Sequence, residues 1–200
     1  IYSKGGAIAA ADGGKVTING GSAYVDTAST SGRYLIYTEG EGSEVVINGG
    51  TYSWDPSDNQ KRAYVYACAG TRVIINGGTY KVGHDGASMT AGSDNWRNDC
   101  IYARDNAKIT INGGEFAYTG DTNTENFQSD GHRFLLNCRD ADYKAGKCSI
   151  TVKGGIFHKF NPGSTSSENP VANYVAAGYS SVAGENDTYV VNVKVAEETE

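Results

Sequence analysis

The stretch VIINGGTYKV, residues 73–82, decides the fold because it recurs along the chain. The other copies are VTINGGSAYV (16–25), VVINGGTYSW (45–54), ITINGGEFAY (109–118) and ITVKGGIFHK (150–159). Their Asn or Lys positions at 19, 48, 76, 112 and 153 are separated by 29, 28, 36 and 41 residues. Self-similarity of this kind is typical of repeat proteins, in which each copy is one structural unit stacked on the next.

Each copy follows a shorter apolar segment, so each repeat offers three short strands. A helix is excluded because the Gly pair inside every apolar run would cost about 1 kcal/mol per Gly. An array of antiparallel hairpins would tolerate the glycines, but it does not explain one motif in one orientation with length variation at a single point. The sequence therefore predicts an all-β chain folded as a right-handed parallel β-helix of about six coils. Residues 174–180 (YVAAGYS) and 189–195 (YVVNVKV) would form the sixth coil.

We expect one domain over residues 1–200, with the INGG-repeat coils in 1–133 and a terminal coil and cap in 134–200. Side chains alternate between the two faces of a strand, so the motif also predicts which residues lie inside. After the Gly-Gly corner, one internal column should contain Ala23, Tyr52, Tyr80, Phe116 and Phe157. At the corner, stacked side-chain amides should form a ladder of Asn19, Asn48, Asn76 and Asn112, which Lys153 interrupts.

Two outward columns are unusual for a surface exposed to water. One is β-branched throughout and contains Thr17, Val46, Ile74, Thr110 and Thr151. The other comes from the preceding strand and contains Tyr37, Tyr66 and Tyr102, with Asn137 at the next position. Such ladders bury well against copies of themselves, so we expect a homotrimer with one of these faces at the threefold contact. The alternative is that β-branched residues simply favour strands.

Composition excludes several classes of function. The net charge is −6 and basic residues form no long run, which argues against nucleic-acid binding. No apolar run approaches the about 18 residues of a membrane span, so no membrane insertion is expected. The four cysteines lack metal-ligand spacing and suit buried free thiols, with one disulfide left open. No cofactor or metal motif is present. Because Ile1 is not a start methionine, we expect a fragment or a processed product.

Insertions between the third strand of one coil and the first strand of the next should emerge on one face, at residues 26–32, 55–62, 83–98, 119–131 and 161–173. Solenoids commonly bind ligands on such a face. An exposed Trp beside acids and amides suits sugar recognition. The candidate ligand-binding residues are His84, Asp94, Trp96, Arg97, Asp121, Phe127 and His132. The alternative is ordinary loop polarity with the aromatic rings tucked against the coils.

An enzyme is the second hypothesis, because many parallel β-helices cleave polysaccharides; a bacterial surface adhesin is the third. Fold-level analogy is weak support. Glycoside hydrolysis needs paired carboxylates, and a lyase needs a base with a charge-neutralising partner. Charged residues gather near the first strands of adjacent coils, namely Asp99, Arg104, Asp105, Arg139, Asp140 and Asp142. Ion pairing between Arg104, Arg139, Asp105 and Asp140 explains this cluster without catalysis, so no catalytic residue is assigned.

The carboxyl half of the chain resembles a terminal module of virion proteins from tailed phages that infect gut bacteria. That module has the pattern LLNC-D-Y-x-G, then I-V-x-GG-F-x-x-FNP, NFVA-x-GY and a closing YxVV. The matching positions here are 135–138, 140, 143, 146, 154–155, 157, 160–162, 173–176, 178–179 and 189–191. Tyr174 stands where the pattern has Phe. The match covers residues 134–191 closely and the INGG repeats generically.

This resemblance implies a structural or adhesive module of a head fibre or tail fibre, located in the virion and extracellular in the free particle. It implies a homotrimer that contacts other virion proteins and binds host or mucosal glycans. The family supplies no catalytic residue to carry over.

Overall fold

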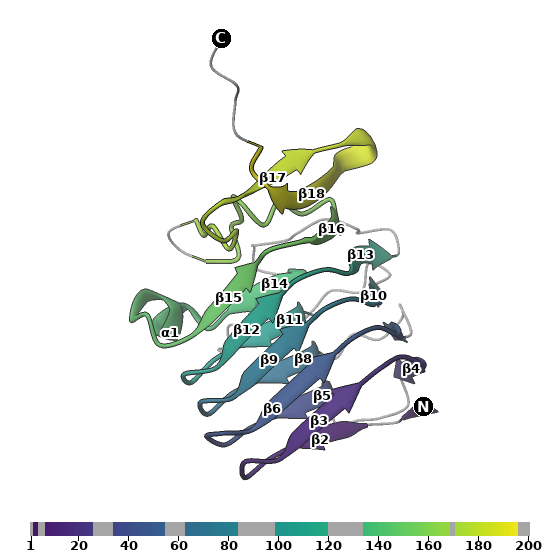
Figure 1. Ribbon diagram of the computed structural model, residues 1–200, viewed down its shortest axis with the longest axis vertical. Coiled ribbons are helices and arrows are strands. Elements are labelled where there is room, and N and C mark those ends of the chain that lie inside the picture. Colours follow the sequence, from purple (N-terminus) through teal and green to yellow (C-terminus); the bar gives the residue numbers. More distant parts are fainter. Residues whose placement is uncertain are drawn as a thin grey trace, which may run out of the picture.

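The computed structural model describes residues 2–3, 7–25, 34–54, 63–83, 99–119, 134–168 and 171–195. These residues form an all-β fold with three sheets, built mainly from parallel strands (Figure 1). The apolar segment that precedes each motif supplies sheet I, with strands β2 (Ile8–Ala10), β5 (Tyr34–Thr38), β8 (Ala63–Ala67), β11 (Asp99–Ala103) and β14 (Leu136–Cys138). The apolar half of the motif supplies sheet II, with β3 (Lys15–Ile18), β6 (Glu44–Ile47), β9 (Arg72–Ile75), β12 (Lys108–Ile111) and β15 (Ser149–Val152).

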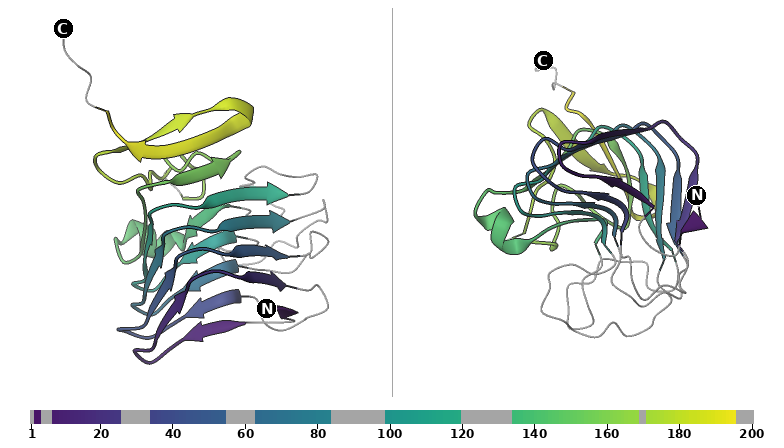
Figure 2. Two further views of the ribbon diagram at one scale, coloured as in Figure 1. Left: turned by 45° about the vertical axis from the view of Figure 1, so that its right-hand side comes forward. Right: turned by 90° about the horizontal axis from the view of Figure 1, so that it is seen from below.

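The residues after the Gly-Gly corner supply sheet III. Its parallel strands are β1 (Tyr2–Ser3), β4 (Ser22–Val25), β7 (Thr51–Trp54), β10 (Thr79–Gly83), β13 (Glu115–Thr119) and β16 (Gly155–His158). Five successive repeats thus place one strand in each sheet, and equivalent residues pair between neighbours, as in Val45 with Val73 and Val73 with Ile109. Seen along the stack, the three sheets overlay repeat upon repeat (Figure 2).

The predicted internal columns are present. The rings of Tyr52, Tyr80, Phe116 and Phe157 stack with centroids 4.8, 4.8 and 4.9 Å apart and planes within 12° of parallel. All four side chains are buried, as is Ala23 at the start of the column. Sheet II adds Val45, Ile47 and their equivalents from the other repeats to the same core. The hydrophobic core therefore lies between the three sheets and runs along the stack.

The predicted asparagine ladder is also present. Each side-chain amide donates to the Oδ1 of the preceding repeat, from Asn48 to Asn19, from Asn76 to Asn48 and from Asn112 to Asn76, all at 2.8 Å. The two glycines that follow have different roles. A Cβ at Gly113 would lie 2.8 Å from the carbonyl oxygen of Asn76, whereas Gly114 has a φ of +120°. The first glycine permits close approach of two repeats, and the second permits the bend.

The predicted sixth parallel coil is present only at Val175, which forms a parallel bridge with Val152, and the strands that follow are antiparallel. β17 (Tyr179–Ala183) and β18 (Thr188–Val193) pair antiparallel to each other, and β18 pairs antiparallel to β16. The turn between them contains the 3₁₀ segment η1 (Glu185–Asp187), where Asn186 and Asp187 adopt positive φ values of 55° and 57°. Such a turn reverses the chain at once, so β18 comes back along β17 and covers the free edge of β16. This hairpin lies at the carboxyl end of the stack (Figure 1).

The outward tyrosines are more buried than predicted. Tyr66 is 6% exposed and Tyr102 is 1% exposed, and Asn137 is fully buried. Tyr34, Tyr37, Tyr66 and Tyr102 pack ring against ring, with the Tyr34 and Tyr66 centroids 4.2 Å apart. This second cluster lies on the side of sheet I away from the main core. The β-branched column of sheet II, in contrast, is half-buried or exposed throughout.

We predict that Phe116→Ala lowers the free energy of unfolding by about 3–5 kcal/mol, because it removes a fully buried ring from the middle of the stack. The control is Ile156→Ala in the next strand of the same sheet, where the side chain is 40% exposed. That change should cost less than about 1 kcal/mol. Chemical denaturation of both variants provides the comparison, and equal losses would contradict the assigned core.

Candidate functional site

The residues predicted to bind a ligand lie outside the described part of the chain, and this holds for His84, Asp94, Trp96, Arg97, Asp121, Phe127 and His132. The segments that carry them join β10 to β11 and β13 to β14. The strands that flank these segments are paired in parallel, so β10 and β13 end at one edge of sheet III, and β11 and β14 begin at one edge of sheet I. The residues that the structure describes form a different candidate site, a groove beside sheet II.

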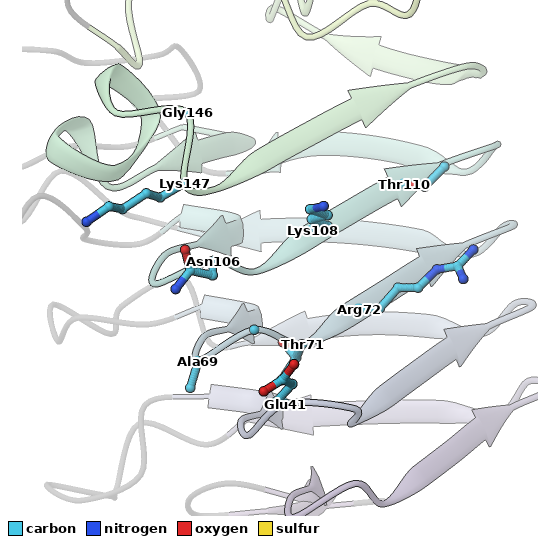
Figure 3. Close-up of a pocket in the computed structure, with 10 residues that line it drawn as sticks. Glu41, Ala69, Thr71, Arg72, Asn106, Lys108, Thr110, Gly146 and Lys147 are labelled. Carbon is cyan, nitrogen blue, oxygen red and sulfur yellow. The ribbon is translucent and has the colours of Figure 1, made fainter.

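An open groove runs over the corner between sheets I and II (Figure 3). It encloses about 970 Å³ and is lined by Glu41, Ala69, Gly70, Thr71, Arg72, Asn106, Lys108, Thr110, Gly146 and Lys147. These residues come from the turns and strand starts of four successive repeats. Paired left-handed conformations make the turns tight, as at Ala69 and Gly70 with φ values of 54° and 80°. The turn at Asp105 and Asn106 has the same conformation, whereas helix α1 (Asp140–Lys144) precedes the residues of the fourth repeat that line the groove.

Basic side chains dominate the charge of the groove. Arg72 and Lys108 are paired residues at the starts of β9 and β12, so they lie side by side on the outer face of sheet II. Lys147 approaches from the next repeat, where its backbone N–H donates to the carbonyl oxygen of Asp142 at 2.8 Å. The Arg72 guanidinium lies 3.8 Å from the Glu44 carboxylate. Within the described residues, neither Lys108 nor Lys147 forms an ion pair.

Polar groups complete the lining. The Thr71 side chain is buried, and its Oγ1 has no hydrogen-bond partner among the residues that the structure describes. Asn106 adopts a positive φ of 67° in the turn and its side chain is exposed beside the groove. Thr110 belongs to the outward β-branched column. The groove therefore combines fixed cations with hydrogen-bonding groups, a combination that suits an anionic polar ligand.

The charged cluster predicted near sheet I is an ion-pair network. Asp105 accepts from Arg104 Nε and from Arg139 Nη2, each at 2.5 Å, and Arg139 Nε lies 2.6 Å from Asp142. The carboxylate paired with Arg139 inside its own turn is thus Asp142, in helix α1 (Asp140–Lys144), rather than the predicted Asp140. Burial alone would raise the pKa of Asp142, but hydrogen bonds from Arg139 and from the Asp105 N–H lower it. Asp99 lies apart from this network, where its carboxylate accepts from the Asn137 amide at 2.8 Å.

A buried carboxyl group at the carboxyl end of the stack was not predicted. Glu168 is 2% exposed, and its Oε1 accepts from the Cys138 N–H at 2.6 Å and from the Tyr174 hydroxyl at 2.5 Å. Its Oε2 is buried and has no hydrogen-bond partner in the described part of the chain. Burial raises the pKa of Glu168 to about 7, against the lowering effect of those two hydrogen bonds. The group fastens the segment before β17 to the end of β14, so we assign it a structural role.

The described residues show neither a metal-binding cluster nor a helix that could span a membrane. The four cysteines are buried and free. Across those residues, no group of three or more His, Cys, Asp and Glu side chains could hold a metal ion. None of the helices described has the length and apolarity needed to cross a bilayer.

The groove could have been found from the sequence, whereas Glu168 could not. Arg72 and Lys108 each precede the first apolar position of successive motifs, so parallel stacking places their basic side chains together. Glu168 belongs to no repeat, and nothing in the sequence near it indicates burial. Comparison with known proteins finds no match, since no family model, no curated protein and no solved structure is significantly similar to the chain.

We predict a pH-dependent stability that Glu168→Gln abolishes. The pKa of about 7 in the folded state exceeds the ordinary value of 4.5, so the folded chain holds this proton more tightly than the unfolded chain. The resulting stabilisation is complete below pH 4.5 and is lost as the pH rises through about 7. Its size is on the order of 3 kcal/mol.

The test compares denaturation of the native chain and of the variant across that pH range. The native chain should lose stability relative to the Gln variant as the pH rises, whereas the exposed control Glu185→Gln should follow the native chain. A constant difference between the native chain and the Glu168→Gln variant would show that this carboxyl group titrates normally.

Proposed function

We propose that the chain is a right-handed parallel β-helix that serves as a structural and adhesive module of a tailed-phage virion appendage, a head fibre or a tail fibre. The continuity of the stack carries this proposal. Two side-chain ladders, the ring stack from Tyr52 to Phe157 and the amide ladder from Asn19 to Asn112, each link four repeats in register. Such a rod resists shear and proteases without a disulfide.

The right-handed sense follows from a general rule. Parallel strands of one sheet are joined by right-handed crossovers in nearly all proteins, because strand twist favours that path. Each repeat here leaves sheet I, passes through sheets II and III, and returns to sheet I beside its previous strand. A coil of that kind with three strands is a parallel β-helix.

Resemblance to the phage virion module concerns the residues that end the stack. The Phe-Asn-Pro segment (160–162) turns the chain after β16, and Asn161 Oδ1 accepts from the Gly163 N–H and the Ser181 hydroxyl, both at 2.9 Å. Tyr174 bonds to Glu168, and the closing Tyr-Val-Val (189–191) lies in β18. The matching residues therefore have a shared structural purpose, which supports membership of a related terminal module.

Adhesion and assembly are assigned to the remaining surfaces. The predicted glycan-binding residues belong to the segments that join β10 to β11 and β13 to β14. For the homotrimer, the tyrosine column is the poorer candidate because Tyr66 and Tyr102 are buried within the chain. The β-branched column of sheet II remains, with Val46 and Ile74 half-buried on the outer face.

A polysaccharide-degrading enzyme is the weaker alternative. The acids that could act in pairs, Asp105 and Asp142, are engaged by Arg104 and Arg139. Glu168 has the raised pKa of a general acid, but its carboxyl group is enclosed at the end of the stack. We therefore assign no catalytic residue.

We predict that the chain copurifies with infectious particles and sediments as a trimer. Peptides from it should band with phage on a density gradient in proportion to infectivity, because an appendage is part of the particle. The purified chain should sediment at three times its mass of 21.1 kDa, and Ile74→Lys should shift it toward the monomer. Peptides found only in the soluble lysate would overturn the virion assignment. If the chain sediments as a monomer and Ile74→Lys does not change this, the outer face of sheet II does not form a trimer contact.

A further inference from the structure

We propose that the groove between sheets I and II binds an acidic oligosaccharide, one that carries carboxylate or sulfate groups along its chain. This inference rests on the proposed adhesive function and deepens it by naming the ligand class and a binding surface within the stack. None of the residues that line this groove belongs to the predicted set of ligand-binding residues between His84 and His132.

Charge is the first argument. The chain carries a net charge of −6, yet Arg72, Lys108 and Lys147 gather around this one groove. Arg72 is partly neutralised by Glu44, but Lys108 and Lys147 have no ion-pair partner among the described residues. Fixed cations gathered at one site of a chain with net negative charge attract an acidic ligand to that site.

Geometry is the second argument. The three cations come from three successive repeats, so hydrogen-bonded strands hold their backbones in a fixed order. Lys108 projects from the middle of the groove, while the Arg72 and Lys147 side chains extend to opposite sides (Figure 3). Cations spread in this way match charges distributed along an extended ligand better than a single compact ion. The volume of about 970 Å³ accommodates several sugar rings.

Hydrogen-bonding groups provide the third argument. The hydroxyl group of Thr110, a half-buried residue of the lining, can both donate and accept a hydrogen bond. The Asn106 amide offers both a donor and an acceptor beside Lys108. Sugar hydroxyl groups can form hydrogen bonds with both side chains, so the groove can recognise hydroxyl groups as well as charge.

A nucleic acid fits the same groove less well. Proteins that bind single strands stack bases on aromatic side chains, whereas none of the ten lining residues is aromatic. Neutral sugars would leave the cations unused. Glu41 lies at one end of the groove and opposes an anionic ligand. Removing the negative charge of Glu41 should therefore strengthen binding, whereas removing a lysine should weaken it.

The experiment measures binding of the purified chain, residues 1–200, to four probes by calorimetry, namely a chondroitin sulfate hexasaccharide, a hyaluronan hexasaccharide, maltohexaose and a single-stranded DNA of equal charge. We expect both acidic oligosaccharides to bind, the sulfated one more tightly, and binding to weaken with salt. Replacing both Lys108 and Lys147 by Gln should weaken binding at least about tenfold, and Glu41→Gln should strengthen it about threefold. The matched control is a double Gln variant of Lys81 and Lys194, two exposed lysines outside the groove, which should bind normally.

Three outcomes would overturn the inference. Equal loss of binding in both double variants would mean nonspecific charge, and tighter binding of the DNA would mean a different class of ligand. Unchanged binding in the Lys108 and Lys147 double variant would place the glycan site elsewhere and leave the adhesive function standing. Absence of the chain from phage particles, with the groove variants behaving as expected, would overturn the virion assignment while the saccharide site stands.

Discussion

Register between neighbouring repeats is the constraint on which the structure depends. Every strand of sheets I and II pairs in parallel with its equivalents in the next repeats, so identical positions lie above one another. Because the side-chain period of a strand is two, a slip of one residue would expose the whole internal column. The Asn ladder and the stacked rings both require that register, and the Gly pair permits the repeats to approach closely enough to maintain it. The groove inherits its row of cations from the same constraint.

Much of the fold was predictable because the repeat encodes it. Alternation placed Tyr52, Tyr80, Phe116 and Phe157 in one buried column, and the recurring Asn predicted the ladder before Lys153. Prediction failed where the chain leaves the repeat. Residues 174–180 resemble a first strand in composition, but the tight turn at Asn186 and Asp187 makes the following strand antiparallel. Local composition does not reveal the partner of a strand.

Other differences concern burial and charge. The outward tyrosines pack on one another, so Tyr102 is buried on a face that alternation alone assigns to solvent. Asp142 rather than Asp140 pairs with Arg139, because helix α1 turns that side chain toward the network. Glu168 is brought to Cys138 by a segment with no repeat to indicate its path. Contacts within the repeat could thus be predicted from sequence spacing. Contacts outside the repeat became known only from the three-dimensional structure.

Excising one complete repeat tests the register most directly. Removal of residues 48–75 joins Ile47 to Asn76, and those two positions already occupy successive places in the stack through a hydrogen bond from the Asn76 N–H to the Ile47 carbonyl oxygen. The shortened chain should keep its β-sheet circular dichroism and unfold cooperatively, because β6 then continues into the corner that β9 used. Removal of residues 48–74 leaves one extra residue at the junction and reverses the alternation that follows, so that chain should lose cooperative unfolding. If both deletions unfold alike, register-matched stacking is not what holds this fold together.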